Sequence, residues 1–332
     1  MTKEYRALVV RKANENQYTR AIELCRIDGL PKGDVLIRVH FSSINYKDCL
    51  SCVGNPGVTR RYPHTPGIDA SGIVETSNSN EFRPGDSVMV IGHALGMSVS
   101  GGFGQYIRVP ASWVMHLPEG LSLFESMIYG TAGYTAALSV EALIENGLHS
   151  DSDAIVVTGA TGGVGSMSVA LLGNLGYNVT ASSGKSDAEQ FLGSIGASKV
   201  IDRAEVNDQT MRNLLIPTWK GAIDTIGGNT LSTLLKKCKD GGVVVSTGLV
   251  ESTHLCTTIL PFILRGIKLV GINADGTDYF QRETIWRKMA GVWKPPVLQA
   301  LATVYRLDDL PFAIDQVLAA VQKGRFVIDL RE

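Results

Sequence analysis

The stretch that constrains this chain most is a short apolar run, 154–158, followed at once by a glycine-rich turn, 159–165. The apolar run is typical of a buried strand, and the residues after the turn continue as a helix toward Leu175. A turn of this kind places backbone N–H groups and a helix N-terminus where a phosphate can sit. Its glycines, at 159, 162, 163 and 165, depart from the usual GxGxxG spacing. The stretch therefore predicts a phosphate-binding strand–turn–helix unit, and a turn without a ligand is the alternative.

The residues after this turn alternate between strand and helix patterns. Apolar runs predict five further strands, at 177–182, 199–201, 221–226, 242–247 and 268–272. Helical patterns lie between them, among others at 185–195 and 229–238. Val- and Ile-rich strands that alternate with helices form a parallel sheet covered on both faces. Six strands beginning at the glycine turn predict a doubly wound, Rossmann-type dinucleotide fold.

The first 125 residues have a different character, because short strand patterns there are separated by Gly and Pro rather than by helices. This pattern predicts a small β-barrel-type domain. Near the C-terminus, a helix at 312–323 precedes one strand at 325–330. One strand cannot form a domain, so we expect it to complete a sheet of the first domain. The predicted α/β chain has a Rossmann domain, 126–296, inserted between two parts of the β domain, 1–125 and 297–332.

Composition narrows the classes of function. The formal net charge of the 332-residue chain is −1, so the chain as a whole has no electrostatic attraction to nucleic acid or to an anionic membrane. The chain has no basic run, and no apolar stretch approaches the ~20 residues that a membrane helix needs. The first residues lack the apolar core of a signal peptide. We expect a cytoplasmic protein that binds neither nucleic acid nor membrane.

The cysteines and histidines do not form a recognisable metal-binding pattern. Cys49 and Cys52 make a CxxC, but a structural zinc site needs four ligands, usually from a second CxxC or a paired His motif. The other three cysteines and the six histidines are dispersed. We expect free thiols and no bound metal.

The end of the second Rossmann strand distinguishes NADPH from NADH. An NAD-specific site places Asp or Glu there to accept from the ribose 2′-OH. This chain has Ser183, Gly184 and Lys185, with no acid before Asp187. Hydroxyls and a cation suit a 2′-phosphate, and Arg203 after the third strand can add a second cation. The segment predicts NADPH as the cofactor, and an ordinary turn followed by a solvated lysine is the alternative.

With these residues in view, the chain resembles the medium-chain dehydrogenase/reductase superfamily, in its quinone-oxidoreductase-like branch. It more closely resembles the NADPH-dependent acryloyl-CoA reductase family. The matching stretches follow the family's order along nearly the whole chain, at 42–48, 66–69, 130–136, 157–165, 221–225 and 261–265. The Asn-Tyr-Lys-Asp at 45–48 and the Pro-Phe-Ile-Leu-Arg at 261–265 are the more specific of these.

The resemblance implies a GroES-like catalytic domain built from both ends of the chain, a Rossmann domain between them, and a homodimer formed through the sixth strand. It implies cofactor contacts at Tyr46, Thr161, Gly162, Gly163, Val164, Ser183, Gly184, Lys185, Arg203, Leu249 and Ile263. An arginine commonly stands at the position of Lys185, and lysine lacks its bidentate fork. Zinc-dependent relatives carry Gly-His-Glu where this chain has Gly67-Ile68-Asp69, so the resemblance also implies a zinc-independent enzyme.

Without a metal or an evident catalytic dyad, the expected reaction is one that the cofactor itself carries, namely hydride transfer to the carbon β to a carbonyl. The candidate residues for orienting the substrate, donating to the enolate oxygen and supplying a proton are in the segment 45–48. Tyr46 offers a hydroxyl, Asn45 an amide dipole, and Asp48 a carboxylate that would orient its neighbours. The alternatives are a packing role for Tyr46, a turn role for Asn45 and a solvated Lys47.

The expected function is the reduction of acryloyl-CoA to propanoyl-CoA with NADPH. One alternative is NADPH-dependent quinone reduction, which needs little acid–base help and tolerates the same sequence. An alternative of another class is a non-catalytic NADPH-binding sensor. Arg60 and Arg61, in the same domain as Tyr46, could hold a CoA phosphate or a carboxylate, or could be a solvated basic pair.

Overall fold

The computed structural model describes residues 3–15, 17–151, 154–210 and 212–331. The chain divides into two compact units. Unit 1 combines Met1–Thr131 with Ala302–Glu332, and unit 2 is Ala132–Leu301. The boundaries between the units lie a few residues after the positions expected from the sequence, at 125/126 and 296/297.

Unit 1 is built on a seven-stranded sheet of order β14-β15-β3-β4-β5-β7, in which β6 also pairs with β3. Its strands are β3 (Val35–Ser43), β4 (Asp69–Ser77), β5 (Ser87–Ile91), β6 (Tyr106–Val109), β7 (Val114–His116), β14 (Ala302–Arg306) and β15 (Arg325–Asp329). The last strand, β15, pairs antiparallel with β3, so that Val327 lies opposite Ser43. The prediction that the terminal strand completes a sheet of the first domain is confirmed.

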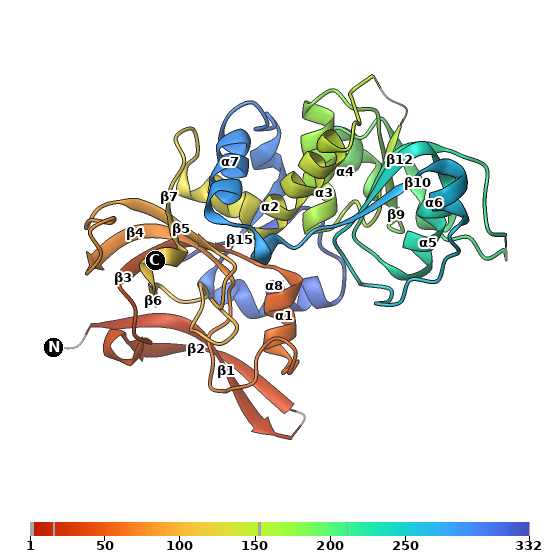
Figure 1. The fold of residues 1–332 in the computed structure, drawn as a ribbon. Helices are drawn as coiled ribbons and strands as arrows, with labels where there is room; N and C mark the ends of the chain where they lie inside the picture. The colour runs from red at the N-terminus through yellow and green to blue at the C-terminus, as the bar shows by residue number, and fades with distance from the viewer. Residues whose placement is uncertain (1–2, 16, 152–153, 211, 332) are drawn as a thin grey trace. The chain divides into compact units, whose positions relative to one another are not determined.

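A hairpin and two helices complete unit 1 (Figure 1). The hairpin consists of β1 (Glu4–Asn14) and β2 (Gln17–Arg26), which pair antiparallel. The helices are α1 (Tyr46–Cys52) and α8 (Leu310–Leu318), which pack on each other. Their buried side chains join those of the sheet in one apolar core, which includes Leu8, Ile37, Cys49 and Ile314.

Unit 2 contains a six-stranded parallel sheet of order β10-β9-β8-β11-β12-β13. Its strands are β8 (Ile155–Val157), β9 (Val179–Ser183), β10 (Lys199–Asp202), β11 (Trp219–Asp224), β12 (Cys238–Ser246) and β13 (Lys268–Gly271). The strand order reverses between β8 and β11, which is the switch point of a doubly wound fold. The prediction of a Rossmann-type sheet is confirmed.

Helices cover both faces of this sheet, which is why its central strands are continuously apolar. Figure 1 shows α3 (Gly163–Asn174) and α4 (Ala188–Ser194) on one side of the strands, and α5 (Gly228–Lys237) and α6 (Leu260–Arg265) on the other. Unit 2 also contains α7 (Tyr279–Ala290). The short 3₁₀ helices of the chain are η1 (Ile27–Gly29), η2 (Ala111–Trp113), η3 (Arg203–Val206), η4 (Ala274–Gly276), η5 (Leu298–Leu301) and η6 (Leu307–Asp309).

The helical stretch α2 (Leu123–Glu145) begins with a capping box. The backbone N–H of Ser122 donates to Glu125 Oε2 at 2.9 Å, and the N–H of Glu125 donates to Ser122 Oγ at 3.2 Å. The helix is interrupted at Gly130, whose φ of 50° and ψ of −158° are not helical. A Cβ at this position would lie 2.4 Å from Ser43 Oγ. Gly130 therefore lets the helix start approach a buried polar group of unit 1.

Two helix boundaries differ from the sequence expectations. Helix α4 begins at Ala188 instead of Lys185, because Ser183 Oγ accepts from the N–H of Lys185 at 3.1 Å and holds that residue in a turn. Helix α8 ends at Leu318 instead of 323, shortly before Ala320 takes a φ of 56°.

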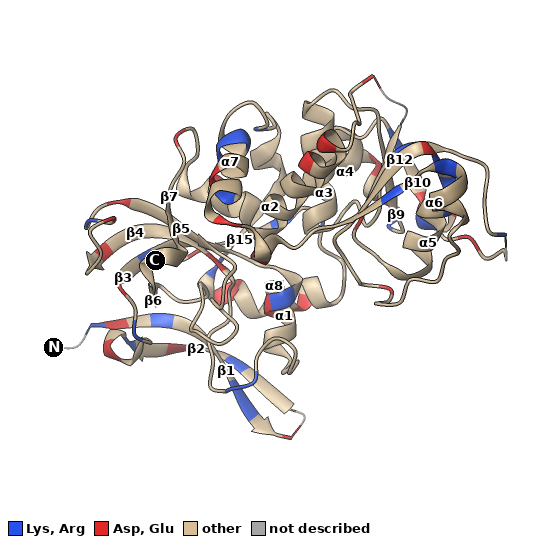
Figure 2. Cartoon of the chain, in the orientation of Figure 1, with Lys and Arg blue, Asp and Glu red and all other residues tan. Residues whose placement is uncertain are grey.

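The charge distribution and the helix lengths bear on possible partners. Acidic and basic residues occur along both units without a long run of one sign (Figure 2). Among the described residues, no helix has the length and apolar character needed to cross a bilayer.

Candidate functional site

The glycine turn of unit 2 connects β8 to α3 and has the form of a phosphate cradle. Gly159 has a φ of 56°, and a Cβ there would lie 2.3 Å from Thr225 Oγ1. A Cβ at Gly165 would lie 2.3 Å from the carbonyl oxygen of Gly159, so the helix packs directly on the turn. The predicted contact positions Thr161, Gly162, Gly163 and Val164 form the start of α3, with Gly162 as its N-cap. Backbone N–H groups at such a helix start are available to an anion.

Polar contacts at the switch point hold this turn in place. Thr158 Oγ1 donates to Asp224 Oδ1 at 2.7 Å, which connects the ends of β8 and β11. Asp224 is fully buried, and burial raises its pKa to about 6. Its carboxylate also accepts from the N–H groups of Ile226 and Gly227, at 3.2 and 2.8 Å. The sequence pattern predicted Asp224 to lie within a strand, 221–226, whereas β11 ends at Asp224; an acid after a buried apolar run is a signal for such a role.

The predicted 2′-phosphate residues lie at the carboxyl ends of β9 and β10, where Ser183 is in register with Asp202. The Arg203 side chain lies over Gly184, because a Cβ on Gly184 would be 2.6 Å from Arg203 Cδ. The Asp202 carboxylate accepts from the N–H of Ala204 at 2.8 Å and so caps η3. The structure therefore brings Ser183, Gly184 and Arg203 together, with the partly buried Lys185 next in the chain.

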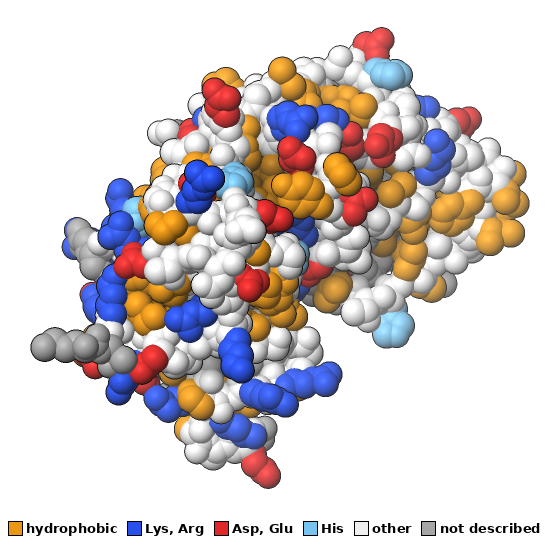
Figure 3. Space-filling model, turned by 60° about the vertical axis from the view of Figure 1, so that its left-hand side comes forward, with side chains coloured by type: hydrophobic (Ala, Val, Ile, Leu, Met, Phe, Trp, Pro, Cys, Tyr) orange, Lys and Arg blue, Asp and Glu red, His pale blue; other side chains and the backbone are white. Residues whose placement is uncertain are grey.

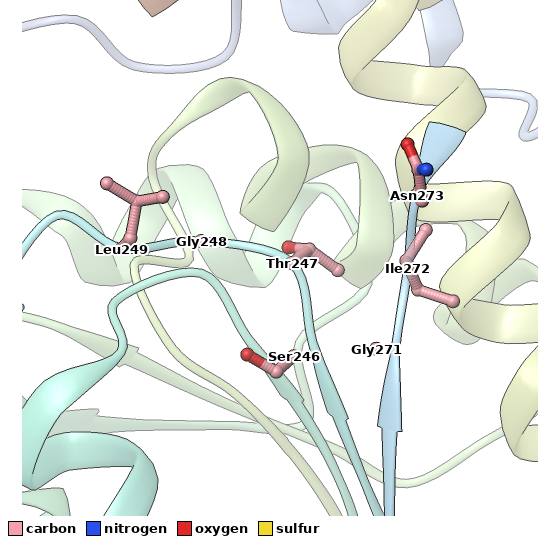
Figure 4. Close-up of a pocket in the computed structure, with 7 residues that line it drawn as sticks. All are labelled: Ser246, Thr247, Gly248, Leu249, Gly271, Ile272 and Asn273. Atoms are coloured by element: carbon pink, nitrogen blue, oxygen red, sulfur yellow. The ribbon is translucent and has the colours of Figure 1, made fainter. Parts of the chain in front are cut away.

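A cavity of about 460 Å³ lies beyond the carboxyl ends of β12 and β13. Figure 4 shows its lining residues on the two segments that leave these strands: Ser246, Thr247, Gly248, Leu249, Gly271, Ile272 and Asn273. A Cβ on Gly248 would lie 2.0 Å from the carbonyl oxygen of Thr225, so a larger residue does not fit here. Of the two predicted contact residues in this region, Leu249 lines the cavity, whereas Ile263 lies on α6 outside the lining.

The predicted catalytic segment lies in unit 1, between β3 and α1. Tyr46 is the first residue of α1, and its side chain is 53% exposed. Asn45 is the N-cap, and its backbone N–H donates to Asp48 Oδ2 at 2.8 Å. Asp48 is fully buried and turned away from solvent. The segment thus presents the Tyr46 ring outward, while the side chains of Asn45 and Asp48 are buried in the unit.

Asn45 connects two buried carboxylates. Its Nδ2 donates to Asp69 Oδ2 at 2.7 Å and lies 3.3 Å from Asp48 Oδ2. Asp48 also accepts from the N–H of Ile68 at 2.8 Å. Asp69 accepts from Thr131, through the N–H at 2.8 Å and through Oγ1 at 2.6 Å. Both carboxylates are therefore saturated with donors from unit 1.

The cation of this cluster is Arg325, the first residue of β15, which is 1% exposed. It makes four hydrogen bonds, to Ile128 O at 3.0 Å, Ile44 O at 3.2 Å, Ser43 Oγ at 3.0 Å and Asn45 Oδ1 at 3.3 Å. Ser43 Oγ in turn donates to Asp69 Oδ2 at 2.7 Å. We name Ser43, Asn45, Asp48, Asp69, Thr131 and Arg325 the buried polar network.

Burial and mutual charge govern the titration of this network. Burial raises the pKa of Asp48 to about 7, and the negative charge of Asp69 adds to this shift. The N–H groups of Asn45 and Ile68 act against it by favouring the carboxylate. Burial lowers the pKa of the Arg325 guanidinium, and Asp69 and Asp48 raise it.

Asn45 and Asp48 were predicted from the sequence, whereas Asp69, Thr131 and Arg325 were not predicted to take part. The available signal was an acid, Asp69, at the start of a buried strand. In the described ranges, no group of three or more His, Cys, Asp or Glu side chains is placed to hold a metal ion. All five cysteines are free.

Two family models match the chain. The model of the alcohol dehydrogenase GroES-like domain matches residues 31–119, and the model described as zinc-binding dehydrogenase matches residues 163–287. These matches fall on the β domain and on the Rossmann sheet respectively.

Relatives match over nearly the full length. The putative quinone oxidoreductase YhfP of Bacillus subtilis is 40% identical over 99% of this chain and 100% of its own. The acrylyl-CoA reductase AcuI of Ruegeria pomeroyi is 39% identical over 98% of this chain and 99% of its own.

Solved structures agree with this likeness. The yhdH oxidoreductase from Salmonella enterica in complex with NADP superposes with a TM-score of 0.94 at 36% identity, covering 98% of this chain and 100% of its own. Bacillus subtilis yhfP with NAD bound superposes with a TM-score of 0.96 at 40% identity, covering 99% and 100%.

Proposed function

Because the chain belongs to the medium-chain dehydrogenase/reductase superfamily of oxidoreductases, we propose that it reduces the C=C bond of acryloyl-CoA with NADPH, giving propanoyl-CoA. The observation that carries this proposal is the 39% identity, over 98% of the chain, to a relative named acrylyl-CoA reductase. Quinone reduction is the second candidate, favoured by the 40% identity to a relative named putative quinone oxidoreductase. The proposed enzyme needs no metal.

The chemistry of unit 2 supports NADPH as the cofactor. Positions 159 and 165 have no room for a Cβ, as expected for a backbone that closely approaches a phosphate. Thr161 to Val164 would receive the pyrophosphate, and Ser183, Lys185 and Arg203 would receive the 2′-phosphate. The compared structures contain either NADP or NAD, so the preference of this chain depends on its own residues near the ribose. We propose a preference for NADPH, because two cations and a hydroxyl lie where an NAD site has an acid.

When bound, NADPH supplies a hydride to the carbon β to the thioester carbonyl, and the overall reaction also consumes one proton. The developing enolate oxygen requires a hydrogen-bond donor, and the α carbon requires the proton. The exposed hydroxyl of Tyr46 is our candidate for one of these tasks. Asn45 cannot serve directly, because its Nδ2 donates to Asp69 and its Oδ1 accepts from Arg325. We propose that Asn45 and Asp48 are positioning residues for Tyr46.

The test is an NADPH-oxidation assay that compares kcat/KM for acryloyl-CoA and for a benzoquinone. We expect turnover of acryloyl-CoA and a higher kcat/KM for it. Tyr46→Phe should lower kcat by about a hundredfold or more, in the range of general acid–base contributions, while the NADPH Kd changes little. Tyr305→Phe, at a partly buried tyrosine of the same unit, is the matched control.

The other outcomes of this assay assign other functions. A higher kcat/KM for the quinone would favour the second candidate. Tight NADPH binding without turnover of any enone, enoyl-CoA or quinone would identify a sensor. An unchanged kcat in Tyr46→Phe would remove its hydroxyl from the mechanism.

We further propose that the enzyme is a homodimer formed along β13, the edge strand of the six-stranded sheet. Apolar side chains near this edge are exposed: Val250, Ile259, Leu264 and Leu269. An exposed edge strand beside apolar side chains suits pairing with a second copy. Sedimentation at micromolar concentration would show a monomer if this proposal is wrong. A cytoplasmic location without nucleic-acid or membrane partners remains a prediction.

A further inference from the structure

Two exposed arginines stand beside the segment that carries Tyr46. Arg60 and Arg61 lie in the loop 55–62, which follows α1. Within the described part of the chain, neither forms an ion pair, and Arg60 Nε donates to Pro56 O at 3.3 Å. Their guanidinium groups therefore retain most of their donors for a ligand.

The loop that carries them is anchored on both sides of the pair. Before the pair, the buried Thr59 Oγ1 lies 2.7 Å from Ser51 Oγ of α1. After it, Tyr62 OH donates to the carbonyl oxygen of Ser51 at 2.7 Å. Asn55 also donates from its N–H to Leu50 O at 3.0 Å. The arginines thus project from an ordered base that is fixed to the helix whose first residue is Tyr46.

A third cation lies on the face of the β1–β2 hairpin that packs against this loop. Lys12 is opposite Tyr18 in the β1–β2 hairpin, so their side chains share one face. The Tyr18 ring packs against the ring of Tyr62, with centroids 4.8 Å apart, and Tyr62 follows Arg61. Lys12 is exposed and, within the described residues, makes no ion pair.

The loop segment itself contributes no acid that offsets the charges of Arg60 and Arg61. The stretch 49–68 contains no Asp or Glu, and the acid of α1, Asp48, is buried in the polar network. Figure 3 shows Lys and Arg side chains gathered toward the lower end of the face it displays. A positive surface of this kind attracts a multiply charged anion and is weakened by salt.

The spacing from Tyr46 fits a long anionic substrate. Helix α1 rises about 8 Å from Tyr46 to Ser51, and the loop and arginine side chains extend beyond it. The pantetheine arm of CoA has about as many backbone bonds as four extended residues, which span roughly 15 Å. A thioester held near Tyr46 could therefore place its nucleotide phosphates at the arginines.

We propose that Arg60 and Arg61, together with Lys12 of the hairpin, bind the phosphate groups of coenzyme A. This inference rests on the proposed function, since a quinone has no such groups. Two adjacent guanidinium groups can each form bidentate hydrogen bonds with a phosphate, which lysines cannot. The loop contributes to KM for CoA esters and takes no part in the chemical step.

The experiment compares three thioesters that share the same C=C bond: acryloyl-CoA, acryloyl-dephospho-CoA and acryloyl-N-acetylcysteamine. In the double variant Arg60→Ser/Arg61→Ser, we expect KM for acryloyl-CoA to rise about tenfold or more, since two charge-assisted contacts are lost. KM for the N-acetylcysteamine ester should stay unchanged, and kcat should stay within twofold for both. The dephospho ester should behave as an intermediate case if the 3′-phosphate is one of the groups bound.

The matched control is Lys32→Ser/Arg83→Ser, which removes the same charge from exposed positions of unit 1 outside this loop. It should leave every KM unchanged. Added KCl should raise the wild-type KM for acryloyl-CoA and have a smaller effect on the arginine variant.

An unchanged KM for acryloyl-CoA in the double variant would overturn the inference while leaving the proposed function intact. An equal rise in KM for the N-acetylcysteamine ester would also overturn the inference, because the loop would then act on the reacting end of the substrate. If the wild type reduces none of the three thioesters, the proposed function fails, and calorimetry with CoA decides the inference. CoA binding that weakens in the arginine variant would support it, and equal or absent binding would reject it.

Discussion

Replacing Arg325 with methionine tests whether charge holds the buried polar network together. Methionine has a similar length and fills the space, but it donates no hydrogen bond. The substitution removes the donors of four acceptors: Ile44 O, Ile128 O, Ser43 Oγ and Asn45 Oδ1. It also leaves the fully buried carboxylates of Asp48 and Asp69 without their cation. Removing one partner of a buried charged group costs about 3–5 kcal/mol of unfolding free energy, and we expect a loss in this range at pH 8.

The pH dependence of this destabilisation tests the electrostatic argument more sharply than its size at one pH. Burial and Asp69 raise the pKa of Asp48 to about 7 in the folded chain, whereas an unfolded Asp titrates near ~4. Between these pH values the folded state holds a proton on Asp48 that the unfolded state has released. The free energy of unfolding is therefore highest at low pH and falls as the pH rises toward 7. Loss of the Arg325 cation raises the pKa of Asp48 further. The fall in stability then continues above pH 7, and one additional proton held between pH 7 and pH 8 changes the free energy of unfolding by at most about 1.4 kcal/mol. We therefore expect the destabilisation of the methionine variant to be smaller at pH 5 than at pH 8 by up to about 1.4 kcal/mol.

Urea unfolding at pH 5 and pH 8 measures the loss of unfolding free energy and its change with pH. Arg325→Lys is the matched control, because it keeps the charge and loses the planar fork. It should be less destabilised than the methionine variant and should show a weaker dependence on pH. Equal destabilisation of Arg325→Met at the two pH values would refute the electrostatic reasoning. A lysine variant as unstable as the methionine variant at pH 8 would do the same.

Two further predictions concern unit 2. Lys185→Ala should raise the NADPH Kd about tenfold and leave the NADH Kd unchanged, because we propose that this cation binds the 2′-phosphate. Fluorescence titration measures both dissociation constants, and equal changes would contradict the proposal. Gly248→Ala should cost about 1–3 kcal/mol and weaken dinucleotide binding, because its Cβ would lie 2.0 Å from the backbone oxygen of Thr225. Thermal unfolding tests this, with Gly193→Ala as the control, since a Cβ there meets nothing within 4 Å. A Gly248 variant as stable as the control would show that the loop can move.

Much of the candidate cofactor site could be predicted from the sequence, because its requirements are local. A glycine such as Gly159 is needed where the backbone turns sharply beside a ligand, and that need is visible in one short stretch. The missing acid after β9 is likewise a property of a few neighbouring residues. The helix start at Lys185 was placed too early, because one side-chain hydrogen bond from Ser183 decided the turn.

The sequence by itself determined the parallel sheet and the split first domain, since strand and helix periodicities arise from residues close together in the chain. Only the tertiary structure decided what surrounds Tyr46. Asn45 meets Arg325 across 280 positions, and Thr158 meets Asp224 across 66. An arginine that opens a strand is usually solvated, so its local pattern contains no sign of burial. Its role follows from the pairing of β15 with β3, which places its guanidinium against Asn45, the N-cap of the helix that begins at Tyr46.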